Sequence, residues 1–143
     1  MTNLLELYEF AENHNIDVDW VPLTASKSLS MPFPDGSYGI AVDPWKMDTL
    51  EIETVLLSHE LGHCMTGSFY NKYATCDVRR KHENRADKWA IQNLISEEEL
   101  DDAVADGYAD IWSLAEHFNV TEDFMRKAVC WYTHGNLATE LYF

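Results

Sequence analysis

Residues 50–67, LEIETVLLSHELGHCMTG, decide the fold because they form the most apolar helical run in the chain. Leucine, isoleucine and valine recur along this stretch at the spacing that builds one face of a helix. Gly67 stands where a left-handed residue commonly ends a helix. The sequence therefore predicts a long, largely apolar helix over residues 50–65.

The same run contains the motif HExxH, with His59, Glu60 and His63 at its three defined positions. Residues four apart share a helix face, so the two imidazoles can converge on one metal ion while Glu60 flanks the open coordination position. HExxH also arises by chance, and the competing interpretation is a helix with two incidental histidines and an acid. The residues that follow must distinguish the two.

A catalytic zinc needs a third protein ligand as well as an open position for water. Metzincins supply that ligand six residues after the second histidine. Thr66 and Phe69 stand where their glycine and third histidine would be, which excludes this class. In sites built from two histidines and a glutamate, the third ligand comes from a separate helix. Glu83 follows near the start of the next predicted helix and is the candidate.

Asp87 lies one helical turn after Glu83, on the same face, where it can accept a hydrogen bond from a ligating imidazole and fix its tautomer. HExxH followed by ExxxD is a much rarer coincidence than HExxH alone, so we favour a metal site over chance. His82 could also act as a ligand, but it points about 100° away from Glu83 and is expected to be solvent-exposed. Asp77 lies still further away, and Cys64 is expected to be a small buried hydrophobe.

This ligand set predicts one Zn²⁺ per chain, with a net charge near +1 at the site and a bound water whose pKa falls to about 7. Glu60 is then the base that takes the proton of the water and returns it to the leaving amine. The zinc polarises the scissile carbonyl and stabilises the oxyanion. Tyr70, Tyr73, Tyr132 and His134 are conceivable further donors to that oxyanion, and no spacing argument selects among them.

The remaining pattern predicts an α+β domain spanning residues 1–143, in which a small sheet packs against the HExxH helix. Short alternating stretches between residues 16 and 43, separated by prolines and the turn PFPDGS, indicate two or three antiparallel strands. Ser96 and Glu99 form a capping box. Helices are expected at about residues 2–14, 50–65, 82–95, 96–107, 110–118 and 121–134, and the tail after Gly135 has no predicted structure.

The strand SYGIAVD at residues 37–43 ends a few residues before the HExxH helix. If it is an edge strand, it can hold an extended peptide by strand addition, as a peptidase does. Otherwise it is an ordinary sheet strand with no part in substrate binding.

Composition narrows the class of partner. Ten Lys and Arg against 25 Asp and Glu give a net charge of −15, which repels phosphate backbones and anionic lipid surfaces. We therefore expect no direct contact with nucleic acid and no membrane. Three cysteines without a CxxC motif, and an N-terminus without a basic region, favour a cytoplasmic location. We also expect a monomer.

Two further features carry competing interpretations. Five of the ten cationic residues fall within residues 79–88, where they either steer an acidic substrate segment or form a solvated helix face that balances nearby acids. Residues 114–129, LAEHFNVTEDFMRKAV, are typical of a helix-turn-helix. Residues 110–134 contain four acids and two bases, so a packing motif is favoured over a DNA-binding module.

Four strings in this order, YGIAVD, HELGHCMTGSFY, ENRADKWAIQNLI and LAEHFNVTEDFMRKA, resemble the ImmA/IrrE family of zinc metallopeptidases over roughly residues 37–134. The resemblance implies a compact gluzincin-like α+β fold, with His59, His63 and Glu83 as metal ligands. It also implies Glu60 as the catalytic base and Asp87 as the partner of a ligating histidine.

The resemblance further implies a substrate. Members of the family typically cleave a helix-turn-helix repressor encoded beside them, which relieves repression of a phage, a mobile element or a stress regulon. We therefore expect an endopeptidase that cuts one cognate regulatory protein. The competing hypothesis is a non-proteolytic antirepressor that binds its partner and needs the metal only to fold, for which Glu60 would be dispensable.

Overall fold

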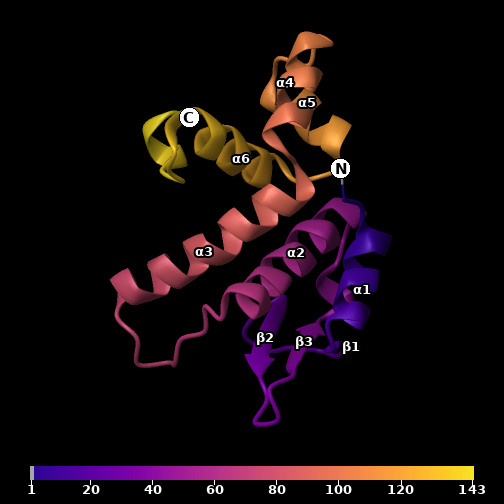
Figure 1. Ribbon diagram of the computed structural model, residues 1–143, viewed down its shortest axis with the longest axis vertical. Coiled ribbons are helices and arrows are strands. Elements are labelled where there is room, and N and C mark those ends of the chain that lie inside the picture. The colour runs from indigo at the N-terminus through magenta and orange to yellow at the C-terminus, as the bar shows by residue number, and fades with distance from the viewer. Residues whose placement is uncertain (1) are drawn as a thin grey trace.

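The computed structural model describes residues 2–143, and it opens with a capped helix that leads into the sheet (Figure 1). Helix α1 (Leu4–Asn13) begins after Asn3, whose side chain accepts a hydrogen bond from the backbone N–H of Glu6 at 2.9 Å. Its buried face, Leu7 and Ala11, contributes to the main core.

Three strands form a mixed sheet in the order β1-β3-β2. β2 (Ser28–Pro32) and β3 (Tyr38–Val42) form an antiparallel hairpin, whereas β1 (Ile16–Trp20) runs parallel to β3. The α+β class is confirmed, but the expectation of purely antiparallel pairing is wrong. A short turn joins β2 to β3, so these two strands pair antiparallel. The longer connection over residues 21–27 places β2 one strand position away from β1, and β3 then fills the position between them.

This strand order also decides which strand has a free edge. β3 is the central strand and is paired on both sides, so of the two interpretations left open for residues 37–43 the structure excludes the edge strand and favours the ordinary sheet strand. β1 and β2 are the edge strands. Edge position depends on pairing between distant segments, which the local sequence pattern of one strand does not record.

Helix α2 (Leu50–Thr66) packs between the sheet and α3 (Cys76–Leu94). The Thr49 side chain caps the start of α2, and Gly67 ends the helix in the left-handed conformation with φ 64°. Thr75 caps α3, which begins six residues earlier than the sequence predicted. Lysine and arginine are good helix formers, so the basic stretch before His82 extends this helix rather than the connector.

The two long helices cross in near contact at Gly62. A Cβ atom built on Gly62 would lie 2.5 Å from the carbonyl oxygen of Ala86, which is closer than real Cβ contacts allow. Only glycine lets the α2 and α3 backbones approach this closely. Ala86 is fully buried at the same crossing.

Three further helices and two short 3-10 turns make up the remaining elements. α4 (Glu97–Ala105) begins with the predicted capping box, and α5 (Ile111–Phe118) and α6 (Glu122–His134) form the predicted helix pair. Short 3-10 turns occupy Pro44–Lys46 and Thr139–Leu141. None of the helices in residues 2–143 has the length and apolar character needed to cross a membrane.

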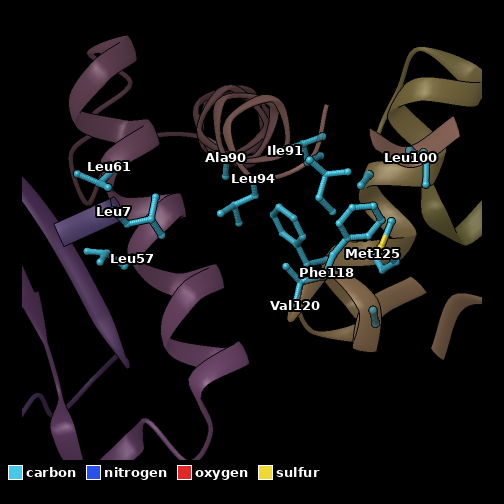
Figure 2. Close-up of a cluster of buried hydrophobic side chains, with 14 of the residues drawn as sticks. Leu7, Leu57, Leu61, Ala90, Ile91, Leu94, Leu100, Phe118, Val120 and Met125 are labelled. Atoms are coloured by element: carbon cyan, nitrogen blue, oxygen red, sulfur yellow. The ribbon is translucent and has the colours of Figure 1, made fainter. Parts of the chain in front are cut away.

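Figure 2 shows α3 between two groups of buried side chains. Leu7, Leu57 and Leu61 lie on the side of α2 and the sheet. The second group, on the side of α5 and α6, includes Phe118, Val120 and Met125. The apolar residues of the helix-turn-helix-like segment are thus buried in the core, as a packing motif requires.

The close crossing predicts the effect of Gly62→Ala. Alanine has the higher helix propensity, but its methyl group must push the α3 backbone away from α2, and overpacking of this kind costs about 1–3 kcal/mol. We expect a lower free energy of unfolding in urea. Gln92→Ala, at an exposed position of α3, is the control and should leave stability within about 0.5 kcal/mol. Equal stability of Gly62→Ala and the wild type would contradict the steric account.

Candidate metal centre

Three side chains from two helices meet at one point. The Nε2 atoms of His59 and His63, both on α2, lie 3.1 Å apart. The Oε2 atom of Glu83, on α3, lies 2.6 Å from the first of these nitrogens and 3.3 Å from the second. One ligand atom from each residue therefore falls within 4.8 Å of the others, a group that can hold a metal ion.

The geometry and chemistry of this group fit a divalent ion such as zinc. Tetrahedral coordination with bonds of 2.0–2.1 Å places neighbouring ligand atoms about 3.3 Å apart, close to the separations found between these three atoms. Two imidazole nitrogens and one carboxylate are a donor set that zinc accepts. An ion would need only a slight spreading of His59 from Glu83.

The outer nitrogen of each imidazole is fixed by a hydrogen bond. His59 Nδ1 lies 2.8 Å from Asp87 Oδ1, and His63 Nδ1 lies 2.6 Å from the backbone oxygen of Ser68. An acceptor at Nδ1 favours the tautomer that carries its proton there, which leaves Nε2 free to bind a metal. Both histidines are thus oriented with Nε2 toward Glu83.

Electrostatics at the centre favour a positive charge between its carboxylates. Burial disfavours the imidazolium of His59, but hydrogen bonds to Asp87 and Glu83 outweigh it and raise the pKa of His59 to about 10. Burial likewise opposes ionisation of Glu83, yet hydrogen bonds to His59, His63 and Tyr70 hold the pKa of its carboxyl well below its usual range. A bound metal ion would displace the proton from His59 and supply the positive charge between the carboxylates in its place.

Tyr70 secures the second oxygen of Glu83. Its hydroxyl donates to Glu83 Oε1 at 2.6 Å, and this bond is the main reason that the pKa of Tyr70 rises to about 12. Among the four candidate oxyanion donors, Tyr70 is the one that the structure brings to the centre. Tyr73 is 82% exposed, Tyr132 donates to the backbone oxygen of Ile95, and His134 stacks on Tyr142.

Glu60 is held by a pair of serines that the sequence pattern did not reveal. Ser28 Oγ donates to Glu60 Oε2 at 2.7 Å, and Ser30 Oγ donates to Oε1 at 2.8 Å. The two serines alternate along β2 and so point to the same face of the sheet, toward α2. Glu60 itself is only 6% exposed, so these hydroxyls replace water around a nearly buried carboxyl group. The sequence shows that Ser28 and Ser30 lie on the same face of a predicted strand. It does not show which helix packs against that face.

Lys127 is a second contributor that the sequence did not predict. Its Nζ lies 3.0 Å from Asp87 Oδ2. A residue of α6 therefore fixes the carboxyl group that is hydrogen-bonded to His59. Asp87 is 8% exposed, and its carboxyl would otherwise be buried with one partner. The two positions are forty residues apart in the sequence, so no local pattern predicts this pair.

Three further residues weighed as ligands lie outside the cluster. Asp77 is exposed, and Cys64 is buried, as expected for a small hydrophobe, with a pKa raised to about 12 mainly by burial. The expectation that His82 is solvent-exposed is wrong. It is half-buried and stacks on Tyr70 at 6.0 Å between ring centroids, and its Nδ1 has no hydrogen-bond partner among the described residues.

A cleft of about 490 Å³ opens over the centre. β2 and the residues just before it line one part, and residues 68–70 line another. His59, Glu60, His63 and Glu83 all lie on its surface. The unpaired edge of the sheet thus adjoins the residues that the sequence assigned to metal binding and catalysis.

Comparison with known protein families gives a match over most of the chain. The family model of peptidase family M78, described as the IrrE N-terminal-like domain, matches residues 11–129, a range that contains the whole candidate centre. No curated protein and no solved structure matches the chain.

The donor geometry predicts that the protein carries about one metal ion per chain and that both His63→Ala and Glu83→Ala lose it. His82→Ala, which removes the imidazole next to Glu83, is the matched control and should keep the metal. Elemental analysis after removal of loosely bound ions measures all four proteins. Retention of a full equivalent by either ligand variant would contradict the assignment.

The bond between Asp87 and His59 predicts a weaker site in Asp87→Ala. Loss of such an outer hydrogen-bond partner typically costs 10–100-fold in metal affinity, because the imidazole is no longer oriented. Competition with a zinc-binding dye measures the dissociation constant. Asp77→Ala removes a carboxylate from the exposed start of the same helix and should leave affinity within about twofold, whereas equal losses in the two variants would indicate a general charge effect.

Proposed function

This chain belongs to the M78 peptidase family, and we propose that it is a zinc-dependent endopeptidase that cuts a cognate regulatory protein. The observation that carries the proposal is the convergence of two HExxH imidazoles and Glu83 beside a Glu60 that lines the same cleft. When bound, zinc would supply a water of lowered pKa and a Lewis acid for the scissile carbonyl.

The residues of the chain would carry the proton transfer and hold the substrate. Glu60, fixed by Ser28 and Ser30, is the group that accepts a proton from water and delivers it to the leaving amine. The free edge of β2 can pair with an extended backbone next to Glu60. Strand addition, which was one of two interpretations of residues 37–43, is therefore proposed for β2 instead.

The identity of the substrate rests on the family resemblance. We propose a helix-turn-helix repressor of a phage, a mobile element or a stress regulon, bound by a monomeric enzyme in the cytoplasm. Three cysteines without a disulfide are compatible with that reducing compartment. The net charge of −15 supports a protein substrate rather than nucleic acid.

The second candidate is an antirepressor that binds its partner without cleaving it. Such a protein needs the metal centre for its fold and has no use for an oriented Glu60. Two hydroxyl groups directed at a nearly buried Glu60 favour the enzyme, because that arrangement keeps a base in place at the cleft.

Glu60→Gln separates the two candidates. The variant should keep its metal and lose about 10²–10⁴-fold in the rate of peptide hydrolysis, which is the usual contribution of a general base. Glu51→Gln makes the same charge change on the same helix outside the cleft and should retain activity. A mixture of quenched fluorescent peptides measures hydrolysis. Unchanged cleavage by Glu60→Gln would contradict the assignment of Glu60 as the general base.

Removal of the serine pair should lower turnover without removing the metal. In Ser28→Ala/Ser30→Ala, Glu60 loses two hydrogen bonds to a charged acceptor, and we expect kcat to fall about tenfold or more while KM changes little. Ser28→Thr/Ser30→Thr keeps both hydroxyls and should restore most of the rate. Ser26→Ala, also at the cleft, is the control. A fall in metal content parallel to kcat would show instead that the serines act on the ligands.

A further inference from the structure

The cationic residues of this acidic chain divide into two groups according to their partners. Three of the ten have a carboxylate within 4.0 Å: Lys46 pairs with Asp43, Arg126 with Glu122 and Asp123, and Lys127 with Asp87. The other seven make no ion pair with any residue of the described range 2–143: Lys27, Lys72, Arg79, Arg80, Lys81, Arg85 and Lys88. The chain has 25 acidic residues, so seven cations without an ion pair are more than we expect and require an explanation.

Several of the unpaired cations flank the cleft. Lys27 lines it just before β2 and is exposed. Arg79 and Arg80 lie one turn before Glu83 on the same side of α3, and both are exposed. The Arg79 guanidinium lies 5.8 Å from the ring centroid of Tyr70 and donates to the backbone oxygens of Lys72 and Ala74, so it also orders the connector beside the cleft.

The carboxylates of the candidate centre are already engaged by other partners, and Asp77, the acid nearest in sequence to Arg79 and Arg80, forms no ion pair with either. Glu83 binds both histidines and Tyr70, Asp87 binds His59 and Lys127, and Glu60 binds the two serines. None of the three is free to neutralise Lys27 or Arg80. Lys27, at the cleft, and Arg79 and Arg80, one turn before Glu83, therefore carry positive charges without an ion-pair partner in a molecule whose overall field is negative.

We propose that Lys27, Arg79 and Arg80 select an acidic segment of the substrate, an extended peptide with Asp or Glu close to the scissile bond. This inference rests on the proposed peptidase function and names its substrate class. The net charge of −15 repels an acidic partner as a whole, so the acidic residues must be local, on a loop or linker that enters the cleft. The absence of a carboxylate within 4.0 Å of these cations favours this proposal over a helix face whose cations are paired with nearby acids.

The chain supplies a matched control on the same helix. Lys81 and Arg85 are exposed and unpaired like Arg80, but they lie roughly 160° round α3 from Glu83, away from the cleft. Lys27→Glu/Arg80→Glu and Lys81→Glu/Arg85→Glu therefore make the same change in net charge at different places. Arg79 is left intact in both because it holds the connector.

Binding is measured by fluorescence anisotropy with the full-length, zinc-loaded Glu60→Gln protein, so that turnover does not consume the probe. The probe is a labelled twelve-residue peptide with glutamates on both sides of a central apolar pair, and its glutamine counterpart is the comparison. Lys27→Glu/Arg80→Glu should weaken binding of the glutamate peptide at least about tenfold, since two surface attractions become repulsions. Lys81→Glu/Arg85→Glu should weaken it less than about threefold.

Two further readouts keep the proposal testable if a variant folds poorly. The wild-type affinity for the glutamate peptide should fall as salt rises from about 0.05 to 0.3 M, because exposed charges are screened. An oligothymidine of similar charge should bind more weakly than the peptide. Equal binding of the two peptides, equal effects of the two double variants, no salt dependence or tighter binding of the oligonucleotide would each overturn the proposal.

Hydrolysis of the same peptides by the protein with Glu60 intact separates this inference from the proposed function. Cleavage of the glutamine peptide as fast as the glutamate peptide overturns the acidic selectivity and leaves the peptidase function standing. Charge-selective binding without cleavage of either peptide overturns the peptidase function and leaves the acidic binding surface.

Discussion

The close crossing of α2 over α3 is the constraint on which the rest of the structure depends. Gly62 lets the two backbones meet at Ala86, and this contact lies between the histidines of one helix and the acids of the other. A larger residue would push apart the two helices that carry the histidines and the acids of the candidate centre. The same crossing brings α3 between the two groups of buried side chains, so stability and chemistry depend on one contact (Figure 2).

Each element around that crossing holds one polar group of the site. β2 supplies the serines for Glu60, the connector after α2 supplies Tyr70 for Glu83, and α6 supplies Lys127 for Asp87. Buried carboxylates are costly unless they are paired and hydrogen-bonded, and the two buried ones at the site, Glu60 and Asp87, both have partners from a separate element. The sheet and the C-terminal helices thus serve the site through hydrogen bonds as well as through packing.

The sequence predicted the candidate site residues that lie on a single helix at a fixed spacing. The helical spacing of HExxH and of ExxxD led to His59, His63, Glu83 and Asp87, and the structure brings these four together, while their roles in metal binding and catalysis stay predictions. The order of the strands, the serine pair and Lys127 were not predicted, because each depends on which distant segments become neighbours. The early start of α3 was missed because a charged stretch before the apolar face looked like a connector.

Zinc K-edge absorption spectroscopy of the purified protein tests the central claim most directly, since it reports the atoms bound to the metal. The account predicts two imidazole nitrogens and one or two oxygens at about 2.0–2.2 Å, with no sulfur. His63→Ala is expected to lose its metal. If zinc is added in excess so that some binds to this variant, the spectrum should show one imidazole instead of two. A shell that contains sulfur at about 2.3 Å, or one made only of oxygens, would contradict a centre built from His59, His63 and Glu83.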